Sequence, residues 1–239
     1  MTQFALVTGA DRGLGLALSA NLLERGWQVF AGQYMPDWPE LNTLAGKCPQ
    51  ALHILPLDVS SIDSAKAAAR AAAKKTQVID LLINNAGVTS PKMTQPITEP
   101  QDYAEMHRLF DVNALGPLRV VEAFLPLTRN SELKRLCFVS SEAGSIGRAE
   151  RTSWYSYCMS KAALNMGIKI LFNQLHPEGY TFRVHHPGWV RSYMSGKKSL
   201  EATLEPEEAA AYAIPIFLGP RQDEDRLALV DYQGQEWPW

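Results

Sequence analysis

Cysteine is scarce in this sequence. Its 239 residues include three cysteines, Cys48, Cys137 and Cys158, and no two of them are spaced as a Cys-x-x-Cys pair. This scarcity argues against a disulfide framework and against a metal site built from thiolates. An odd number of cysteines in a chain that shows no secretory signal is typical of a reducing compartment, so we expect the protein to be cytoplasmic.

Neither sign of charge dominates the sequence, and long apolar runs are absent from it. Lysine and arginine together number 23 against 25 for aspartate and glutamate, which gives a formal net charge of -2. Without a basic excess, neither nucleic acid nor a membrane surface is an expected partner. No apolar run approaches the roughly 20 residues of a transmembrane helix. The start of the chain also lacks the charged and apolar regions of a signal peptide.

What the sequence does contain is an alternation of short apolar segments with helical patterns. The apolar segments are too short and too continuous to have a solvated face, so they predict buried parallel strands at residues 4–8, 28–32, 52–57, 81–83, 136–140, 181–185 and 227–231. Helices are predicted at residues 14–25, 61–76, 103–127, 156–174 and 206–217. Such alternation predicts an α/β fold of a single domain, a three-layer doubly wound parallel sheet (Rossmann fold).

Three regions lack a regular pattern, at residues 34–39, 89–101 and 189–204. Loops after the carboxyl ends of parallel strands are where such a sheet binds ligands. Several aromatic residues lie in or beside these regions, among them Trp38, Trp154, Trp189 and Tyr193. They could wall an apolar substrate pocket, or they could be ordinary packing or interface residues.

A glycine-rich turn follows the first predicted strand, with the sequence TGADRGLG from Thr8 to Gly15. Glycines allow the backbone to turn tightly and to approach a pyrophosphate that faces a helix N-terminus. The spacing is GxxxGxG rather than GxGxxG, and a tight turn without a ligand is the alternative interpretation. The position between an apolar strand and a helix favours a dinucleotide site.

Tyr157 and Lys161 are four residues apart, on one face of a predicted helix. A free phenol has a pKa near 10, and a nearby ammonium favours its ionised form, which suits proton exchange with a carbonyl/alcohol pair. Alone, the pair is more often a surface tyrosine beside a surface lysine. Upstream, Ser140 and Ser141 end an apolar strand. A serine hydroxyl there could donate to a substrate oxygen, and simple strand termination explains the two serines equally well.

Taken together, these features resemble the short-chain dehydrogenase/reductase family. The matching motifs occur in the family's order and approximate spacing along essentially the whole chain: the glycine-rich turn, Asn84-Asn85-Ala86-Gly87, Asn113, Ser141, Tyr157/Lys161 and Pro187-Gly188. The resemblance implies one NAD(P)-binding domain over residues 1–239 that transfers a hydride between the cofactor and a carbonyl/alcohol substrate. The segments around Ser141 and Tyr157, together with the ending Trp237-Pro238-Trp239, resemble the C-factor/sniffer-like carbonyl reductases.

The resemblance also implies a role for each matching position. Tyr157 would exchange the proton with the substrate oxygen, and Lys161 would lower the tyrosine pKa and hold the nicotinamide ribose. Ser141 would orient the substrate oxygen, and Asn113 would support a water that leads from Lys161 to solvent. The implied cofactor-binding residues are Thr8, Gly9, Asp11, Arg12, Gly13, Leu14, Gly15, Gln33, Asp58, Val59, Asn85, Ala86, Gly87, Tyr157, Lys161, Pro187, Gly188, Val190 and Ser192. No metal is expected.

The second predicted strand bears on the choice of cofactor. In NAD-preferring folds an acidic residue after this strand bonds the ribose 2′-hydroxyl, whereas here the strand runs into Gln33 and Tyr34. Arg12 resembles the basic residue that NADP-preferring relatives place on the 2′-phosphate, although a solvated turn residue is the plainer interpretation. NADP(H) is therefore favoured, with NAD(H) as the alternative.

Two further expectations concern the substrate mouth and assembly. Residues 145–156 form a longer segment than in many relatives, which would reshape the mouth of the substrate site. A homodimer or homotetramer is implied by the resemblance. A non-catalytic dinucleotide-binding regulator or signalling protein on the same scaffold is the alternative to an enzyme, because a fold alone does not fix function.

Overall fold

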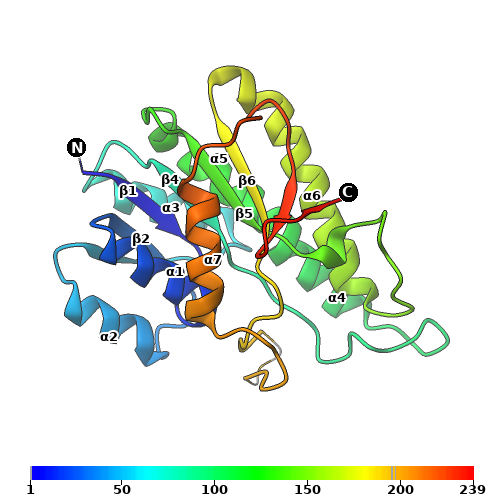
Figure 1. Cartoon of the computed structure of the whole chain (residues 1–239). Coiled ribbons are helices and arrows are strands. Elements are labelled where there is room, and N and C mark those ends of the chain that lie inside the picture. Colours follow the sequence, from blue (N-terminus) through cyan, green and yellow to red (C-terminus); the bar gives the residue numbers. More distant parts are fainter. Residues whose placement is uncertain (1, 195, 197) are drawn as a thin grey trace.

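A mostly parallel sheet organises the chain (Figure 1). The structure is a computed structural model that describes residues 2–194, 196 and 198–239. In the described part the strands are β1 (Phe4–Val7), β2 (Gln28–Gln33), β3 (Leu52–Pro56), β4 (Leu81–Asn84), β5 (Arg135–Val139), β6 (Thr181–His186), β7 (Leu229–Asp231) and β8 (Glu236–Trp237). Their order is β3-β2-β1-β4-β5-β6-β7-β8, and only β8 is antiparallel to its neighbour. The predicted doubly wound sheet is thus confirmed.

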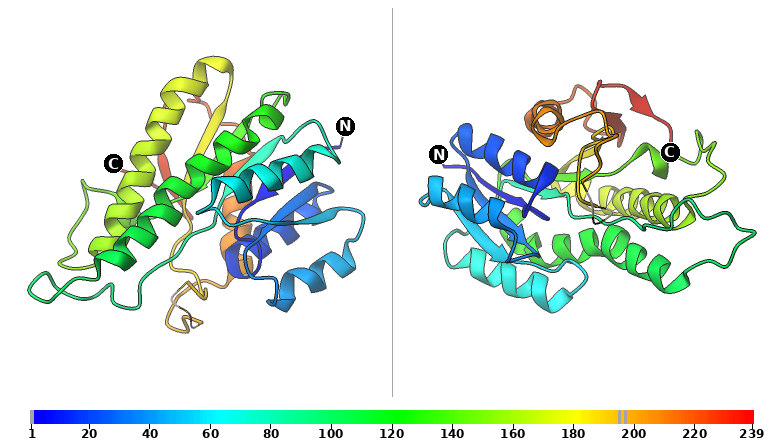
Figure 2. Two further views of the ribbon diagram at one scale, coloured as in Figure 1. Left: turned by 180° about the vertical axis from the view of Figure 1, so that it is seen from behind. Right: turned by 90° about the horizontal axis from the view of Figure 1, so that it is seen from below.

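Helices cover both faces of the sheet, as the end-on view in Figure 2 shows. They are α1 (Gly13–Glu24), α2 (Pro39–Lys47), α3 (Ile62–Ala73), α4 (Tyr103–Phe110), α5 (Gly116–Thr128), α6 (Tyr155–Leu175) and α7 (Pro206–Leu218). Successive strand residues point to opposite faces. Leu6 of β1 therefore packs with α3, α5 and α6, whereas Ala5 and Val7 pack with α1, α2 and α7.

Two elements were not expected from the sequence. Helix α2 begins at Pro39, at the end of a segment predicted to be irregular, and it buries a single residue, Leu41. So short a helix with so narrow an apolar face gives little periodic signal. Strand β8 has two residues, and it exists only because it pairs with β7.

The helix predicted at residues 103–127 is interrupted. Helix α4 ends at Phe110, a π-helical turn follows at Asp111–Leu115, and α5 begins at Gly116. Pro117 lacks an N–H and cannot continue the regular hydrogen-bond ladder, which favours a break at this point. π-Helical turns are rare and occur frequently at functional sites. This one contains Asn113.

The parallel strands bring their following loops to one edge of the sheet. Val7 pairs with Ile83, Ile83 with Cys137, and Val139 with His185, so these strand ends are aligned. The segments that follow β1, β4, β5 and β6 therefore meet at the carboxyl edge, where open α/β sheets bind ligands. Within the described residues, no helix combines the length and apolar character needed to cross a bilayer.

Candidate active site

The glycine-rich turn is bonded tightly to the segment after β4. The Thr8 hydroxyl accepts hydrogen bonds from the main-chain N–H groups of Asn85 and Ala86, both at 3.0 Å. The Asn85 side chain donates to the Thr8 carbonyl at 2.9 Å and to the Gly9 carbonyl at 3.2 Å. A Cβ on Gly15 would lie 2.1 Å from the Gly9 oxygen, so only glycine fits there. These bonds and this close approach define the shape of the turn.

The first turn of α1 faces this loop with its main-chain N–H groups uncapped. Arg12 is the N-cap residue and makes no side-chain capping bond, and the first turn, with Gly13, Leu14 and Gly15, carries no acidic residue. Unpaired N–H groups and the helix dipole make such an end a site for anions. Gly13 has φ +56°, a conformation that favours glycine.

Asp11, which is predicted to bind the cofactor, bonds to main-chain groups of the protein. Its carboxylate accepts hydrogen bonds from the main-chain N–H groups of Tyr34 and Met35 at 3.0–3.1 Å, and the residue is buried. Asp11 therefore fixes the loop after β2 against the glycine-rich turn. This contact aligns the end of β2, with Gln33, beside Arg12.

Arg12 lies beside two aromatic side chains that are in contact with each other. Its guanidinium is 4.2 Å from the ring centre of Trp38 and 5.3 Å from that of Tyr193, and the two rings meet edge to face at 5.0 Å. Such cation–π contacts hold the guanidinium in place while leaving its N–H groups available. Among the described residues, Nε2 of Gln33 and Nε1 of Trp38 are buried donors without an acceptor. Unpaired donors thus gather where a phosphate would be recognised.

Asp58 and Val59, which are predicted to bind the cofactor, follow β3. The Asp58 carboxylate accepts from the Ser60 hydroxyl at 2.6 Å, and Val59 is buried. A Cβ on Gly116 would lie 2.9 Å from Cγ2 of Val59, so the start of α5 packs directly on this segment.

Tyr157 and Lys161 lie on α6, with the Lys161 ammonium 5.8 Å from the centre of the tyrosine ring. Lys161 is buried and donates to the Val139 carbonyl at 3.0 Å. Burial lowers the pKa of Lys161 to about 8. Burial also raises the pKa of Tyr157 to about 12, whereas a hydrogen bond with Ser141 lowers it. Desolvation is therefore the largest effect of the protein groups on the Tyr157 pKa, and the lowering expected from Lys161 is not among these effects.

Asn113 joins the π-helical turn to the segment after β4 and to α6. Its side chain accepts from the Val88 N–H at 2.8 Å and donates to the Val88 carbonyl at 2.9 Å and to the Ser160 hydroxyl at 3.0 Å. A Cβ on Gly87 would lie 3.4 Å from Oδ1 of Asn113 and 3.8 Å from Nζ of Lys161. Gly87, Asn113 and Lys161 therefore border one small space.

Ser141 begins a short 3₁₀ turn, Glu142–Gly144, directly after β5. A Cβ on Gly144 would lie 2.8 Å from the main chain of Lys161, so glycine is required for this close approach to α6. Ser140 donates to the side chain of Asn165 at 2.6 Å, and Asn165 donates to the Gly144 carbonyl at 3.1 Å. These bonds fix the turn that carries Ser141.

The segment after β6 folds back toward the glycine-rich turn. Gly188 has φ +78°, and Val190 forms an isolated bridge with Leu204. A Cβ on Gly13 would lie 3.9 Å from the Cβ of Ser192. The segment that includes Pro187 and Ser192 therefore closes the site from the β6 side.

Four supporting side chains were missed in the sequence: Trp38, Ser160, Asn165 and Tyr193. Asn165 gives a usable signal, since it lies four residues after Lys161 on the same helix face. Ser160 gives none, because its partner Asn113 is 47 residues away. For Trp38 and Tyr193 the sequence predicts walls of an apolar substrate pocket or ordinary packing, and not the contact with Arg12.

With the geometry described, comparison with known proteins identifies the family. The sequence model described as short chain dehydrogenase matches residues 3–203. The chain belongs to this family. As a short-chain dehydrogenase/reductase, it is a NAD(P)-dependent oxidoreductase, and its predicted membership is confirmed.

The relatives of this short-chain dehydrogenase include both a signal protein and reductases. It is 40% identical over 164 residues to C-signal of Myxococcus xanthus, covering 69% of this chain and 95% of that one. A structure of NADPH-bound carbonyl reductase from chicken fatty liver matches with a TM-score of 0.87 and 30% identity, covering 100% of this chain and 99% of that chain. A Burkholderia multivorans short-chain dehydrogenase/reductase with bound NADP also has a TM-score of 0.87, with 31% identity and 100% of both chains covered.

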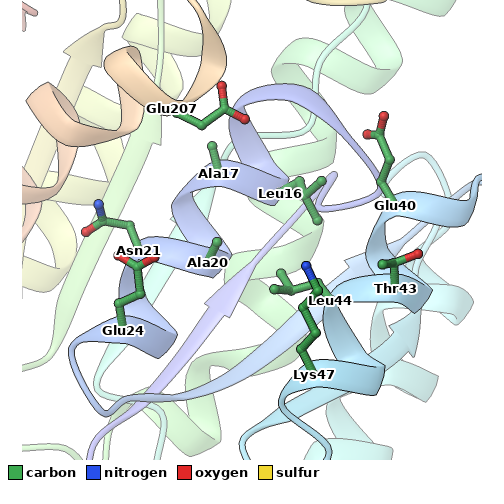
Figure 3. A pocket seen from close by; sticks show the side chains of 10 residues that line it. All are labelled: Leu16, Ala17, Ala20, Asn21, Glu24, Glu40, Thr43, Leu44, Lys47 and Glu207. Atoms are coloured by element: carbon green, nitrogen blue, oxygen red, sulfur yellow. The ribbon is translucent and has the colours of Figure 1, made fainter.

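A groove on the outer surface of this dehydrogenase lies away from the motifs (Figure 3). It runs between α1 and α2 and is bordered by Glu207 at the start of α7. Leu16 and Leu44 contribute apolar surface to it, and none of the candidate catalytic or cofactor residues lines it. The candidate active site is therefore defined by the strand ends and not by this groove.

Proposed function

We propose that this short-chain dehydrogenase reduces a carbonyl to an alcohol with NADPH, and that Tyr157 is the acid/base. The observation that carries the proposal is the meeting of Tyr157, Lys161, Ser141 and Asn113 at the carboxyl edge of the sheet, beside the glycine-rich turn. A signalling protein would not need a buried lysine between a tyrosine and an amide. Two similar structures support the same function, since one is a carbonyl reductase with bound NADPH and the other is a short-chain dehydrogenase/reductase with bound NADP.

The protein groups suit the reductive direction. A bound nicotinamide cofactor supplies the hydride. Because burial raises the pKa of Tyr157 to about 12, the phenol is protonated at neutral pH and can donate to a carbonyl oxygen as negative charge develops on it. The Ser141 hydroxyl would donate to the same oxygen and orient it. Lys161, with a pKa of about 8, is mostly an ammonium at pH 7 and would stabilise the resulting phenolate.

The donors near Arg12 favour NADP(H) over NAD(H). Gln33 and Trp38 each bury an N–H without an acceptor among the described residues, and Arg12 is held against the rings of Trp38 and Tyr193. A 2′-phosphate would satisfy these groups, whereas a 2′-hydroxyl would leave most of them unpaired. Asn85, Ala86 and Gly87 would line the adenosine side, and the first turn of α1 would hold the pyrophosphate.

We further propose that the whole chain acts as one domain, in the cytoplasm, and as a homodimer or homotetramer. Met159, Met166 and Ile170 are more than half exposed and lie at helical spacing along α6. Exposed apolar side chains gathered on one helix face are typical of protein interfaces. Light scattering at micromolar concentration would test assembly, and a monomer would contradict it.

The test of the proposed function is a panel of aldehydes and ketones with NADPH or NADH, followed by nicotinamide absorbance. We expect turnover with NADPH that Tyr157→Phe removes. Tight binding of NADPH with no turnover of any carbonyl would favour the alternative, a dinucleotide-binding signalling protein. The likeness to C-signal makes this second outcome worth testing.

A further inference from the structure

The last eight residues, 232–239, form a C-terminal segment that returns to the active site. Asp231 at the end of β7 accepts hydrogen bonds from the N–H groups of Gln233 and Gln235 and from Nε1 of Trp237, all at 2.9 Å. This buried carboxylate folds β8 back along β7. In Figure 1 the end of the chain lies on the same side of the molecule as α6.

The segment then bonds to the residues that follow Ser141. The Ser145 hydroxyl donates to the Pro238 carbonyl at 2.5 Å, across 93 residues of sequence. The Gly147 N–H donates to the main-chain oxygen of Trp239 at 3.0 Å. Ser145 is also the C-cap residue of the 3₁₀ turn whose N-cap residue is Ser141. The C-terminal segment therefore holds the far end of the turn that carries Ser141.

Aromatic contacts extend this attachment to both sides of the site. The Trp237 ring lies 4.8 Å from the Arg148 guanidinium and meets the His186 ring edge to face at 6.0 Å. A Cβ on Gly188 would lie 2.9 Å from the Tyr232 ring, so that ring packs on the main chain of the Pro187-Gly188 turn. The segment thus joins the loop after β5 to the turn after β6.

The loop has two other attachments to the rest of the described chain: at its far end the Trp154 N–H donates to the Met93 carbonyl at 2.7 Å, and Arg151 contacts the 3₁₀ turn. Arg151 makes a bidentate pair with Glu142 at 2.6–2.8 Å and lies 4.8 Å from the Trp154 ring. Residues 148–151, which follow Gly147, are all exposed. The contacts at Ser145 and Gly147 are therefore what fixes the loop next to the 3₁₀ turn.

We propose that residues 232–239 are a positioning element of the active site, which holds Ser141 and the loop at residues 145–154 in place for the carbonyl substrate. The inference rests on the proposed function, because Ser141 acts on a substrate only if that function is correct. The segment itself touches no cofactor residue of the glycine-rich turn. The Tyr232 ring packs on Gly188, a predicted cofactor residue, whereas Pro238 and Trp239 bond to Ser145 and Gly147. Loss of Pro238 and Trp239 should therefore affect the carbonyl and spare the cofactor.

The test compares Ser145→Ala and a chain lacking Pro238 and Trp239 with wild type. We expect kcat/KM for a carbonyl to fall about three- to tenfold in Ser145→Ala, the size of one lost hydrogen bond, and further in the truncated chain. The dissociation constant of NADPH, measured by fluorescence, should stay within about twofold. Hydrogen exchange at residues 142–151 should become faster in both.

Ser131→Ala is the matched control. Ser131 is equally buried and donates to Asp80 at 2.7 Å, but it precedes β5 at the opposite edge of the sheet. The Ser131→Ala substitution should lower the stability of the protein and leave KM for the carbonyl unchanged. If the truncated chain does not fold, Ser145→Ala alone decides the matter.

Three outcomes separate the hypotheses. Unchanged kcat and carbonyl KM in Ser145→Ala, with wild type active, would overturn the positioning role and leave the proposed function intact. Equal losses of NADPH affinity and carbonyl turnover would also overturn it, because they would indicate general destabilisation. A wild-type protein without carbonyl turnover would overturn the proposed function instead, while faster exchange at residues 142–151 would still support the attachment.

Discussion

The cofactor side of the site is built around one glycine-rich turn, whereas the substrate side is assembled from several separate segments of the chain. Thr8 accepts two main-chain N–H groups at the β1–β4 junction, and Gly15 fits only because it has no side chain. On the other side, Asn113 depends on Ser160 and Ser145 depends on Pro238. The cofactor side therefore resembles a fixed motif, and the substrate side can vary one contact at a time.

The largest expected effect is the loss of turnover in Tyr157→Phe, which should leave cofactor binding in place. Tyr157→Phe removes one hydroxyl and keeps the ring that packs near Trp154. We expect turnover to fall by about 10²–10⁴-fold, the usual contribution of a general acid, with NADPH affinity nearly unchanged. Steady-state kinetics and a cofactor titration measure both.

Tyr155→Phe is the control for that variant, because Tyr155 has Met159 four residues later and not a lysine. It should behave as wild type. Wild-type turnover in Tyr157→Phe would remove the tyrosine from the mechanism.

Substitution of Lys161 should affect the substrate side and the cofactor side together, since Lys161 is assigned a role on each. Lys161→Ala is expected to lose about 10²-fold or more in turnover and also about tenfold in cofactor affinity, because a charged hydrogen-bond donor is lost. Lys161→Arg should rescue only in part, since a guanidinium is a planar fork and not a point charge. If Lys161→Ala binds NADPH as wild type does, the ribose contact is wrong.

A buried histidine of β6, His185, should make the fold sensitive to acid. Burial lowers the pKa of His185 to about 4, from 6.5 in the unfolded chain. Above pH 6.5 the residue is neutral in both states, so it has no effect. As the pH falls from 6.5 toward 4, only the unfolded chain takes up the proton, and stability falls.

The expected cost is about 2 kcal/mol at pH 5. Urea unfolding at pH 7.5 and pH 5 measures it. His185→Leu should have a smaller loss of stability between these two values, and an equal loss would assign the acid sensitivity to other groups.

A change at Arg12 tests the cofactor side alone. Arg12→Ala should weaken NADPH binding by about 1.5–3 kcal/mol, the range for hydrogen bonds to charged groups, and leave NADH binding unchanged. Gln33→Asp should shift preference toward NADH by repelling the 2′-phosphate.

Arg25→Ala is the control, because it removes the same charge at the other end of α1. It should change the affinity for neither NADPH nor NADH. Tighter binding of NADH than NADPH by wild type, or an equal loss of both in Arg12→Ala, would contradict the choice of NADP(H).

The sequence alone determined the doubly wound sheet, the glycine-rich turn and the pairing of Tyr157 with Lys161. These features depend on local pattern: apolar segments of strand length, glycines at fixed spacing, and residues four apart on a helix. Of the supporting side chains that the sequence did not assign, Asn165 had a usable spacing from Lys161, whereas Ser160 and Trp38 had no motif that pointed to their partners.

Only the tertiary structure decided how the substrate side is assembled. The π-helical turn at Asn113 and the bond from Ser145 to Pro238 join segments 47 and 93 residues apart. Burial raises the pKa of Tyr157, whereas its spacing from Lys161 in the sequence predicts a lower pKa. Desolvation and long-range hydrogen bonds depend on which residues surround a group in space, and a local sequence pattern does not specify that.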